Sequence, residues 1–255
     1  MDSLNYFNLK VQRKLSQVFN IEIFTKIYKG DLKGYKFLAN NPDSYFINEY
    51  ENNNFSYVLN ELNNNPGSII YDLGANIGYF SMLCSATSPQ SKIFCFEPIP
   101  VNMAVLCRHL LINRIKNVFP VNFAISDHFG LVDFSADNLS HSYTYKQSSA
   151  HYGNRQINIK VGIISMDILI NDFEFAKPDI LKIDVEGAEY DVLAGAVNVI
   201  KNYKPKILLS THEAHVTGVE EKCLAFLDDV NYSYTKIEND IDRPVGLNDF
   251  WCIAK

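Results

Sequence analysis

The sequence lacks the features that mark membrane-spanning and secreted proteins. Its apolar runs all fall short of the roughly 20 residues that a membrane-spanning helix needs. Residues 1–6 lack the basic and apolar regions of a signal peptide. The five cysteines include no C-x-x-C pair, which favours buried, reduced thiols over a disulfide framework. We therefore expect a cytoplasmic protein with no membrane span.

Basic residues are also scarce, because 23 Lys and Arg stand against 29 Asp and Glu, for a net charge of −6. No run of Lys or Arg occurs, whereas nucleic-acid-binding proteins usually carry a basic patch. We therefore predict no nucleic-acid partner. The 255 residues are 47% hydrophobic, which suffices for the core of one domain with an extension. The sequence carries no signal for an oligomeric state.

The chain is organised around residues 68–81. The apolar run at 69–73 predicts a buried strand, Gly74 and Gly78 predict a tight turn, and helical spacing begins at Ile77. Such a junction is expected to direct backbone N–H groups and the positive end of a helix dipole at a ligand. Asp72 stands where dinucleotide-binding loops have a glycine, and its charge would repel a phosphate. A ligand that carries an ammonium fits better.

From residue 69 onward, strands and helices alternate, which predicts an α/β fold with a mostly parallel, doubly wound sheet covered on both faces. Residues 1–66 are predicted to form a small, mainly helical N-terminal extension, and residues 67–255 the α/β domain. Strands are expected at 69–73, 92–96, 117–123, 131–134, 157–164, 178–184, 206–209, 232–237 and 250–254, the last two as an antiparallel hairpin. Helices are expected at 77–86, 101–113, 188–200 and 219–230.

Several predicted strands end on polar or acidic residues, at the edge of the sheet where ligands bind in this class of fold. Glu97 ends the second of these strands, where its carboxylate can accept two hydrogen bonds from a ribose diol. Asp127 follows the third strand, where it can meet an adenine amino group; a turn-forming role for Asp127 stays equally open.

Together these motifs resemble those of class I S-adenosylmethionine-dependent methyltransferases, and more narrowly those of the FkbM family. The residues that carry the resemblance are 72–81, Phe96-Glu97-Pro98 with Asn102, 124–127, and the block Leu-Lys-Ile-Asp-Val-Glu-Gly-Ala-Glu at 181–189. The resemblance implies a Rossmann-like sheet with an antiparallel C-terminal strand and S-adenosyl-L-methionine as the cofactor. The expected cofactor-binding residues are Asp72, Gly74, Ala75, Asn76, Gly78, Glu97, Pro98, Asn102, Ser126 and Asp127.

Methyl transfer to a hydroxyl requires a group that takes the proton of the acceptor. Asp184 ends the strand expected beside the cofactor strand and is the first candidate, followed by Glu186, His212 and Glu213. Helix capping by the two acids at 184 and 186, and a structural role for the histidine, stay open as alternatives. Asp184, His212 and Glu213 also offer ligand atoms for a divalent ion, but nothing fixes their geometry, so we predict no metal.

The predicted function is therefore O-methylation of a hydroxyl on a sugar, a glycan intermediate or a secondary metabolite. N-methylation of a small molecule and a non-catalytic binding role are the alternatives. Residues 137–156 are rich in Ser, His and Tyr without clear periodicity, and we predict a substrate-facing loop there. The expected partner is a small-molecule or glycan acceptor.

Overall fold

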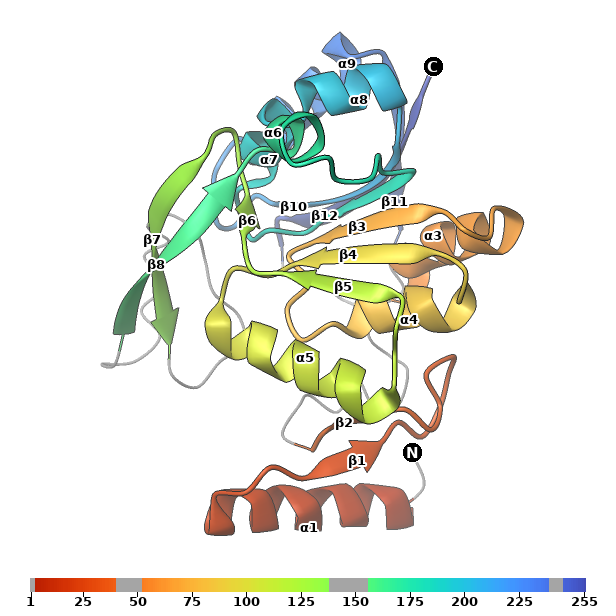
Figure 1. Ribbon diagram of the computed structural model, residues 1–255, viewed down its shortest axis with the longest axis vertical. Coiled ribbons are helices and arrows are strands. Elements are labelled where there is room, and N and C mark those ends of the chain that lie inside the picture. The colour runs from red at the N-terminus through yellow and green to blue at the C-terminus, as the bar shows by residue number, and fades with distance from the viewer. Residues whose placement is uncertain (1–2, 40–51, 138–155, 239–244) are drawn as a thin grey trace.

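A mixed seven-stranded sheet forms the centre of the protein in a computed structural model that describes residues 3–39, 52–137, 156–238 and 245–255. Its strands are β3 (Ile69–Leu73), β4 (Lys92–Phe96), β5 (Val118–Val121), β9 (Ile180–Ile183), β10 (Lys206–His212), β11 (Tyr232–Ile237) and β12 (Leu247–Ala254). Their order is β11-β12-β10-β9-β3-β4-β5, and β12 runs antiparallel to both of its neighbours (Figure 1). The predicted mostly parallel sheet with an antiparallel C-terminal strand is confirmed.

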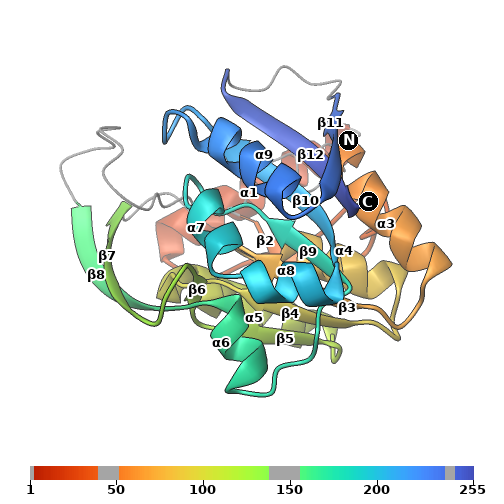
Figure 2. The ribbon, with the colours of Figure 1, turned by 90° about the horizontal axis from the view of Figure 1, so that it is seen from above.

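Helices cover both faces of this sheet (Figures 1 and 2). One face carries α3 (Asn52–Asn64), α4 (Tyr79–Thr87) and α5 (Pro100–Asn113), and the other carries α6 (Met166–Asn171), α7 (Glu189–Ala194), α8 (Val197–Tyr203) and α9 (Val219–Asp229). Successive strand residues point to opposite faces, so Ile70 joins one core cluster and Tyr71 and Leu73 join the other. Because the sheet is buried on both faces, the sequences of its central strands are nearly continuous apolar runs.

A second, three-stranded sheet has the order β6-β8-β7, with β6 (Ala124–Ile125), β7 (Gly130–Asp137) and β8 (Gln156–Ile164). The strands β7 and β8 pair antiparallel over their whole length and stand off one side of the molecule (Figure 2). This confirms the predicted strands at 131–134 and 157–164. The predicted substrate-facing loop lies, from residue 138 to 155, outside the described residues.

The N-terminal segment contains α1 (Ser3–Phe19) and the hairpin of β1 (Phe24–Lys26) and β2 (Lys36–Leu38), which packs against α5 (Figure 1). His109, fully buried in α5, joins the two parts. Its Nε2 accepts a hydrogen bond from Leu38 N at 3.1 Å, so Nδ1 carries the proton and donates to Ile77 O at 2.9 Å. The N-terminal segment therefore packs against the core of the α/β domain. The domain boundary at residue 66 stays a prediction. None of the described helices is both long enough and apolar enough to cross a bilayer.

The single helix predicted at 188–200 is wrong, because α7 and α8 are separated at Gly195 and Ala196. A Cβ atom at Gly195 would lie 1.9 Å from the carbonyl oxygen of Ser126, so only glycine fits at this position without a shift of the backbone. The carboxylate of Asp167 accepts hydrogen bonds from Asn198 N and Val199 N and thereby caps the new helix. Both contacts come from distant parts of the chain, so helical periodicity does not reveal them.

We predict that Gly195→Ala destabilises the protein by about 1–3 kcal/mol, the usual range for overpacking. Gly195 has φ −81°, which alanine adopts freely, so the loss would come from the clash alone. Gly130→Ala is the matched control, since a Cβ there meets its nearest atom at 3.4 Å. Urea denaturation measures both variants. Equal unfolding midpoints would contradict the tight approach at Ser126.

Candidate active site

The glycine loop between β3 and α4 is held by its own backbone. Gly74 N and Ala75 N both donate to Phe96 O at 3.0 Å, and Asn76 N donates to Glu97 Oε2 at 2.8 Å. The expectation that the loop directs its N–H groups at a ligand is therefore wrong for these three groups. At these three groups the loop is shaped by its neighbouring strand.

The two glycines of the loop are required by close packing of the protein on itself. Gly74 and Gly78 have φ values of +79° and +87°, which favour glycine. A Cβ on Gly74 would lie 1.9 Å from the carbonyl oxygen of Asp184, and one on Gly78 would lie 2.9 Å from Leu106 Cγ. Gly74 thus brings the loop directly against the end of β9.

Asp72 lies beneath the loop with no exposed surface. Its Oδ2 accepts a hydrogen bond from Ser81 at 2.6 Å, and its Oδ1 is 3.1 Å from Lys182 Nζ. The same ammonium, also buried, donates to Gly74 O at 3.2 Å and lies 3.2 Å from Asp184 Oδ2. The charge of Asp72 therefore meets the ammonium of Lys182 rather than that of a ligand. Asp72 thus lies against Lys182 and Ser81, and its expected contact with the cofactor stays a prediction.

Glu97 is 4% exposed and holds the far side of the loop. Its carboxylate accepts hydrogen bonds from Asn76 N at 2.8 Å, Ile99 N at 2.9 Å and Asn102 Nδ2 at 3.3 Å. Burial raises the pKa of Glu97 to about 7, although these hydrogen bonds oppose the shift. A carboxylate has about four acceptor positions, so three donors leave one for a further hydroxyl.

The remaining predicted cofactor residues follow β4 and β6. Pro98 is tied to this region by Asn122, whose side chain donates to Pro98 O at 3.1 Å. Ser126 Oγ lies 3.3 Å from Asp127 Oδ1, and that carboxylate is 2.5 Å from His128 Nδ1. The hydrogen bond with His128 lowers the pKa of Asp127. Because Asp127 already has this partner, its contact with an adenine stays a prediction.

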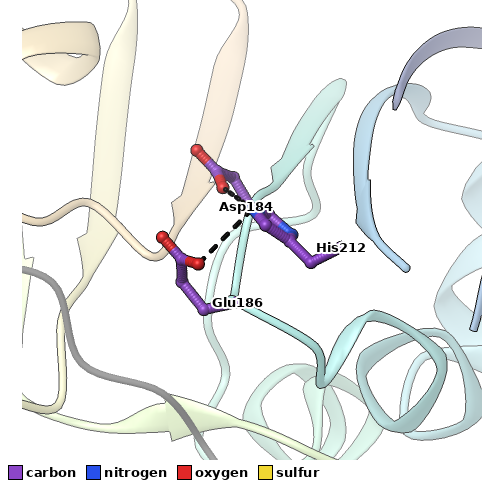
Figure 3. A group of neighbouring side chains, drawn as sticks. All are labelled: Asp184, Glu186 and His212. Atoms are coloured by element: carbon purple, nitrogen blue, oxygen red, sulfur yellow. Dashed lines mark ion pairs between the residues drawn. The ribbon is translucent and has the colours of Figure 1, made fainter. Parts of the chain in front are cut away.

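The three predicted catalytic residues lie together at the carboxyl ends of β9 and β10 (Figure 3). His212 Nε2 is 3.4 Å from Asp184 Oδ1 and 3.6 Å from Glu186 Oε2. The two strands are parallel neighbours, which places the end of β10 beside the turn that follows β9. Glu186 and Gly187 have φ values of +57° and +107°, a left-handed turn that keeps the Glu186 side chain on the same side as Asp184.

Two partners of this cluster were missed from the sequence: Lys182 and Glu189. Glu189 is fully buried, and its Oε1 is 2.7 Å from His212 Nδ1 and accepts from Gly187 N at 2.9 Å. A charged residue inside an apolar strand such as β9 is the signal that could have revealed Lys182. Glu213, by contrast, does not join the cluster, because its carboxylate accepts from Gly218 N and Glu220 N at the start of α9.

The electrostatics of the cluster favour a cation. Burial lowers the pKa of His212, but the hydrogen bond with Glu189 and the charge of Asp184 raise it further, to about 9. Burial also raises the pKa of Glu186. The site therefore concentrates negative charge around one imidazole, directly beside the glycine loop.

The fold is that of the class I methyltransferases. The solved structure of the FkbM methyltransferase of Methylobacillus flagellatus has the same fold, with a TM-score of 0.52 and 16% identity over 72% of this chain and 43% of that one. The FkbM methyltransferase domain model matches residues 72–234, which is more than half of the chain. The chain belongs to the FkbM methyltransferase family, as the sequence motifs predicted, and it is a methyltransferase.

Two curated relatives show how far the similarity extends. The hexuronic acid methyltransferase AglP of Haloferax volcanii is 29% identical over 182 residues, which cover 70% of each chain. The 2-O-methyltransferase NoeI of Sinorhizobium fredii is 31% identical over 144 residues, or 51% of this chain and 58% of NoeI. Both alignments support the family assignment.

We predict that Lys182→Met lowers the free energy of unfolding by about 3–5 kcal/mol, because it leaves the buried charge of Asp72 without its partner. Adding Asp72→Asn should recover part of this loss. The control is Lys160→Met, which breaks an exposed ion pair with Asp133 and should cost less than about 1 kcal/mol. Chemical denaturation measures all three. A loss at Lys182 no larger than that at Lys160 would contradict a structural ion pair.

Proposed function

We propose that this chain transfers a methyl group from S-adenosyl-L-methionine to a hydroxyl oxygen of a sugar, a glycan intermediate or a secondary metabolite. The observation that carries the proposal is the contact between the glycine loop at Gly74 and the carboxylate cluster that begins at Asp184. The names of AglP and NoeI, a hexuronic acid methyltransferase and a 2-O-methyltransferase, support a sugar hydroxyl as the acceptor.

The residues around the loop fit this cofactor. S-adenosyl-L-methionine has a ribose diol and no phosphate, and it supplies an electrophilic methyl group on a sulfonium. Glu97, buried and with one acceptor position left, suits a ribose hydroxyl, and Asn76 and Asn102 hold its carboxylate in place. The loop donates its N–H groups to Phe96 and Glu97, which agrees with a ligand that brings no phosphate to it.

The acceptor oxygen must lose its proton as it gains the methyl group. Asp184 and Glu186 present carboxylate oxygens for this purpose, with side chains 21% and 35% exposed. An acceptor held there would lie beside Gly74, so the cofactor and the hydroxyl would meet at one edge of the sheet. Lys182 holds the second oxygen of Asp184 and so fixes the direction of that carboxylate.

We predict that cofactor affinity rises with pH through about 7, the pKa of Glu97. The ionised carboxylate accepts a hydrogen bond from a ribose hydroxyl, and its population rises from about a tenth at pH 6 to about nine tenths at pH 8. Calorimetry should therefore show roughly tenfold tighter binding at pH 8. Glu97→Gln should weaken binding and remove the pH dependence, while Asp133→Asn, an exposed control, changes neither. A Glu97→Gln variant that keeps the wild-type pH profile would contradict the assignment.

We predict that Glu186→Gln slows methyl transfer by about 10²-fold or more while leaving cofactor affinity unchanged, since a positioned proton acceptor contributes about 10²–10⁴-fold. The assay follows labelled methyl groups onto sugars with free hydroxyls, hexuronic acids included. The control is Glu221→Gln, an exposed acid on α9. Cofactor binding without transfer to any acceptor would instead favour a non-catalytic role, and full transfer by Glu186→Gln would favour a nitrogen acceptor.

A further inference from the structure

The cluster of Asp184, Glu186 and His212 has the geometry of an incomplete metal coordination sphere (Figure 3). Each side chain offers one ligand atom, and the three atoms lie within 4.8 Å of one another. His212 Nε2 lies 3.4 Å and 3.6 Å from the two carboxylate oxygens. A cation with ligand bonds of about 2.0–2.2 Å holds neighbouring ligand atoms about 3 Å apart. The two distances from His212 Nε2 exceed this spacing by only about half an ångström.

Glu189 orients the histidine for this role. Its Oε1 is 2.7 Å from His212 Nδ1, which directs the proton to Nδ1 and the lone pair of Nε2 toward the two carboxylates. Metal-binding histidines commonly have this arrangement, with a carboxylate on the nitrogen that does not bind the metal. Glu189 is fully buried, so its side chain holds the ring in one orientation.

Lys182 and His215 lie beside the two other ligands. Lys182 Nζ lies 3.2 Å from Asp184 Oδ2, which leaves Oδ1 directed at His212. His215 Nδ1 lies 3.2 Å from Glu186 Oε2, and its ring stacks on that of His212 with centroids 5.4 Å apart. Glu189 and Lys182 therefore fix the directions of His212 and Asp184, and His215 lies beside the Glu186 oxygen that faces His212.

The net negative charge of the cluster favours the binding of a cation. The ammonium of Lys182 lies between Asp72 and Asp184, so this one positive charge faces the carboxylates of Asp72, Asp184, Glu186 and Glu189, a net excess of three negative charges beside one imidazole. Partly buried carboxylates need compensating positive charge. A divalent cation bound to a neutral His212 would offset two of these three negative charges.

We propose that Asp184, Glu186 and His212 bind one divalent cation of the Mn²⁺ class. Two carboxylate oxygens and one imidazole nitrogen suit Mn²⁺, which accepts both ligand types, better than Ca²⁺, which prefers six to eight oxygens. Three protein ligands leave about half of an octahedral sphere open. Glu186 and Asp184 are partly exposed, so the open side is accessible from solvent.

A cation at this position would also determine which class of acceptor the protein methylates, a consequence that rests on the proposed function. Open positions on the metal would bind two neighbouring oxygens of one acceptor, such as a vicinal diol or a hydroxyl beside a carboxylate. A bound divalent cation lowers the pKa of a coordinated hydroxyl, whose proton would pass to the Glu186 oxygen that does not bind the cation, and the freed oxygen would then take the methyl group. Acceptors with an isolated hydroxyl are expected to be poorer substrates.

The test is titration of Mn²⁺ alone into the full chain after treatment with a chelator. Binding is measured as the loss of the electron paramagnetic resonance signal of free Mn²⁺. We expect one site, with affinity weakened at least tenfold by Asp184→Asn, Glu186→Gln or His212→Gln. His128→Gln is the matched control, because His128 also pairs with an aspartate but on an exposed surface. Circular dichroism verifies that each variant is folded.

Glu189→Gln tests the positioning role and is expected to weaken Mn²⁺ binding by about 10–100-fold, as for other partners of metal-binding histidines. Absence of Mn²⁺ binding by the folded wild type would overturn the proposal. Binding that all four variants leave unchanged would mean an adventitious ion only and would overturn it too. These measurements contain neither cofactor nor acceptor, so failure of methyl transfer would count against the proposed function and leave the metal site standing.

Discussion

The buried ammonium of Lys182 is the interaction on which the site depends. Its Nζ lies 3.1–3.2 Å from oxygens of Asp72, Gly74 and Asp184, which belong to the end of β3, the glycine loop and the end of β9. A buried ammonium is tolerated only with such partners, so these three segments are fixed relative to one another. The loop and the carboxylate cluster consequently form one unit rather than two adjoining sites.

Strand register explains why this unit forms at the carboxyl edge of the sheet. Leu73, the last residue of β3, pairs with Phe96 on one side and with Ile183 on the other. The chain segments after all three strands therefore emerge side by side. Glu97 then anchors the loop from the β4 side while Gly74 contacts Asp184 on the β9 side. One edge of the sheet thus carries both the glycine loop and the carboxylate cluster.

The sequence predicted the elements whose signals are local. The predicted bounds of the strands at 69–73, 92–96 and 232–237 agree with the observed ones, because each strand is a short run of residues with high strand propensity that ends clearly on both sides. The clustering of Asp184, Glu186 and His212 also followed from the rule that parallel strands end at one edge. What could not be predicted depends on contacts through space: the break at Gly195 is set by a carbonyl at Ser126, and the Lys182 and Glu189 partners are set by packing.

The difference between Glu186 and Glu213 shows how backbone geometry selects the members of the cluster. Both acids are close to the site along the chain, and Glu213 directly follows His212. Yet the Glu213 carboxylate accepts from Gly218 N and Glu220 N, so the end of β10 contributes only its histidine. The acids must then come from the turn after β9. There the positive φ of Glu186, followed by Gly187 packed against Val216, brings an acid two residues beyond Asp184 toward the same imidazole.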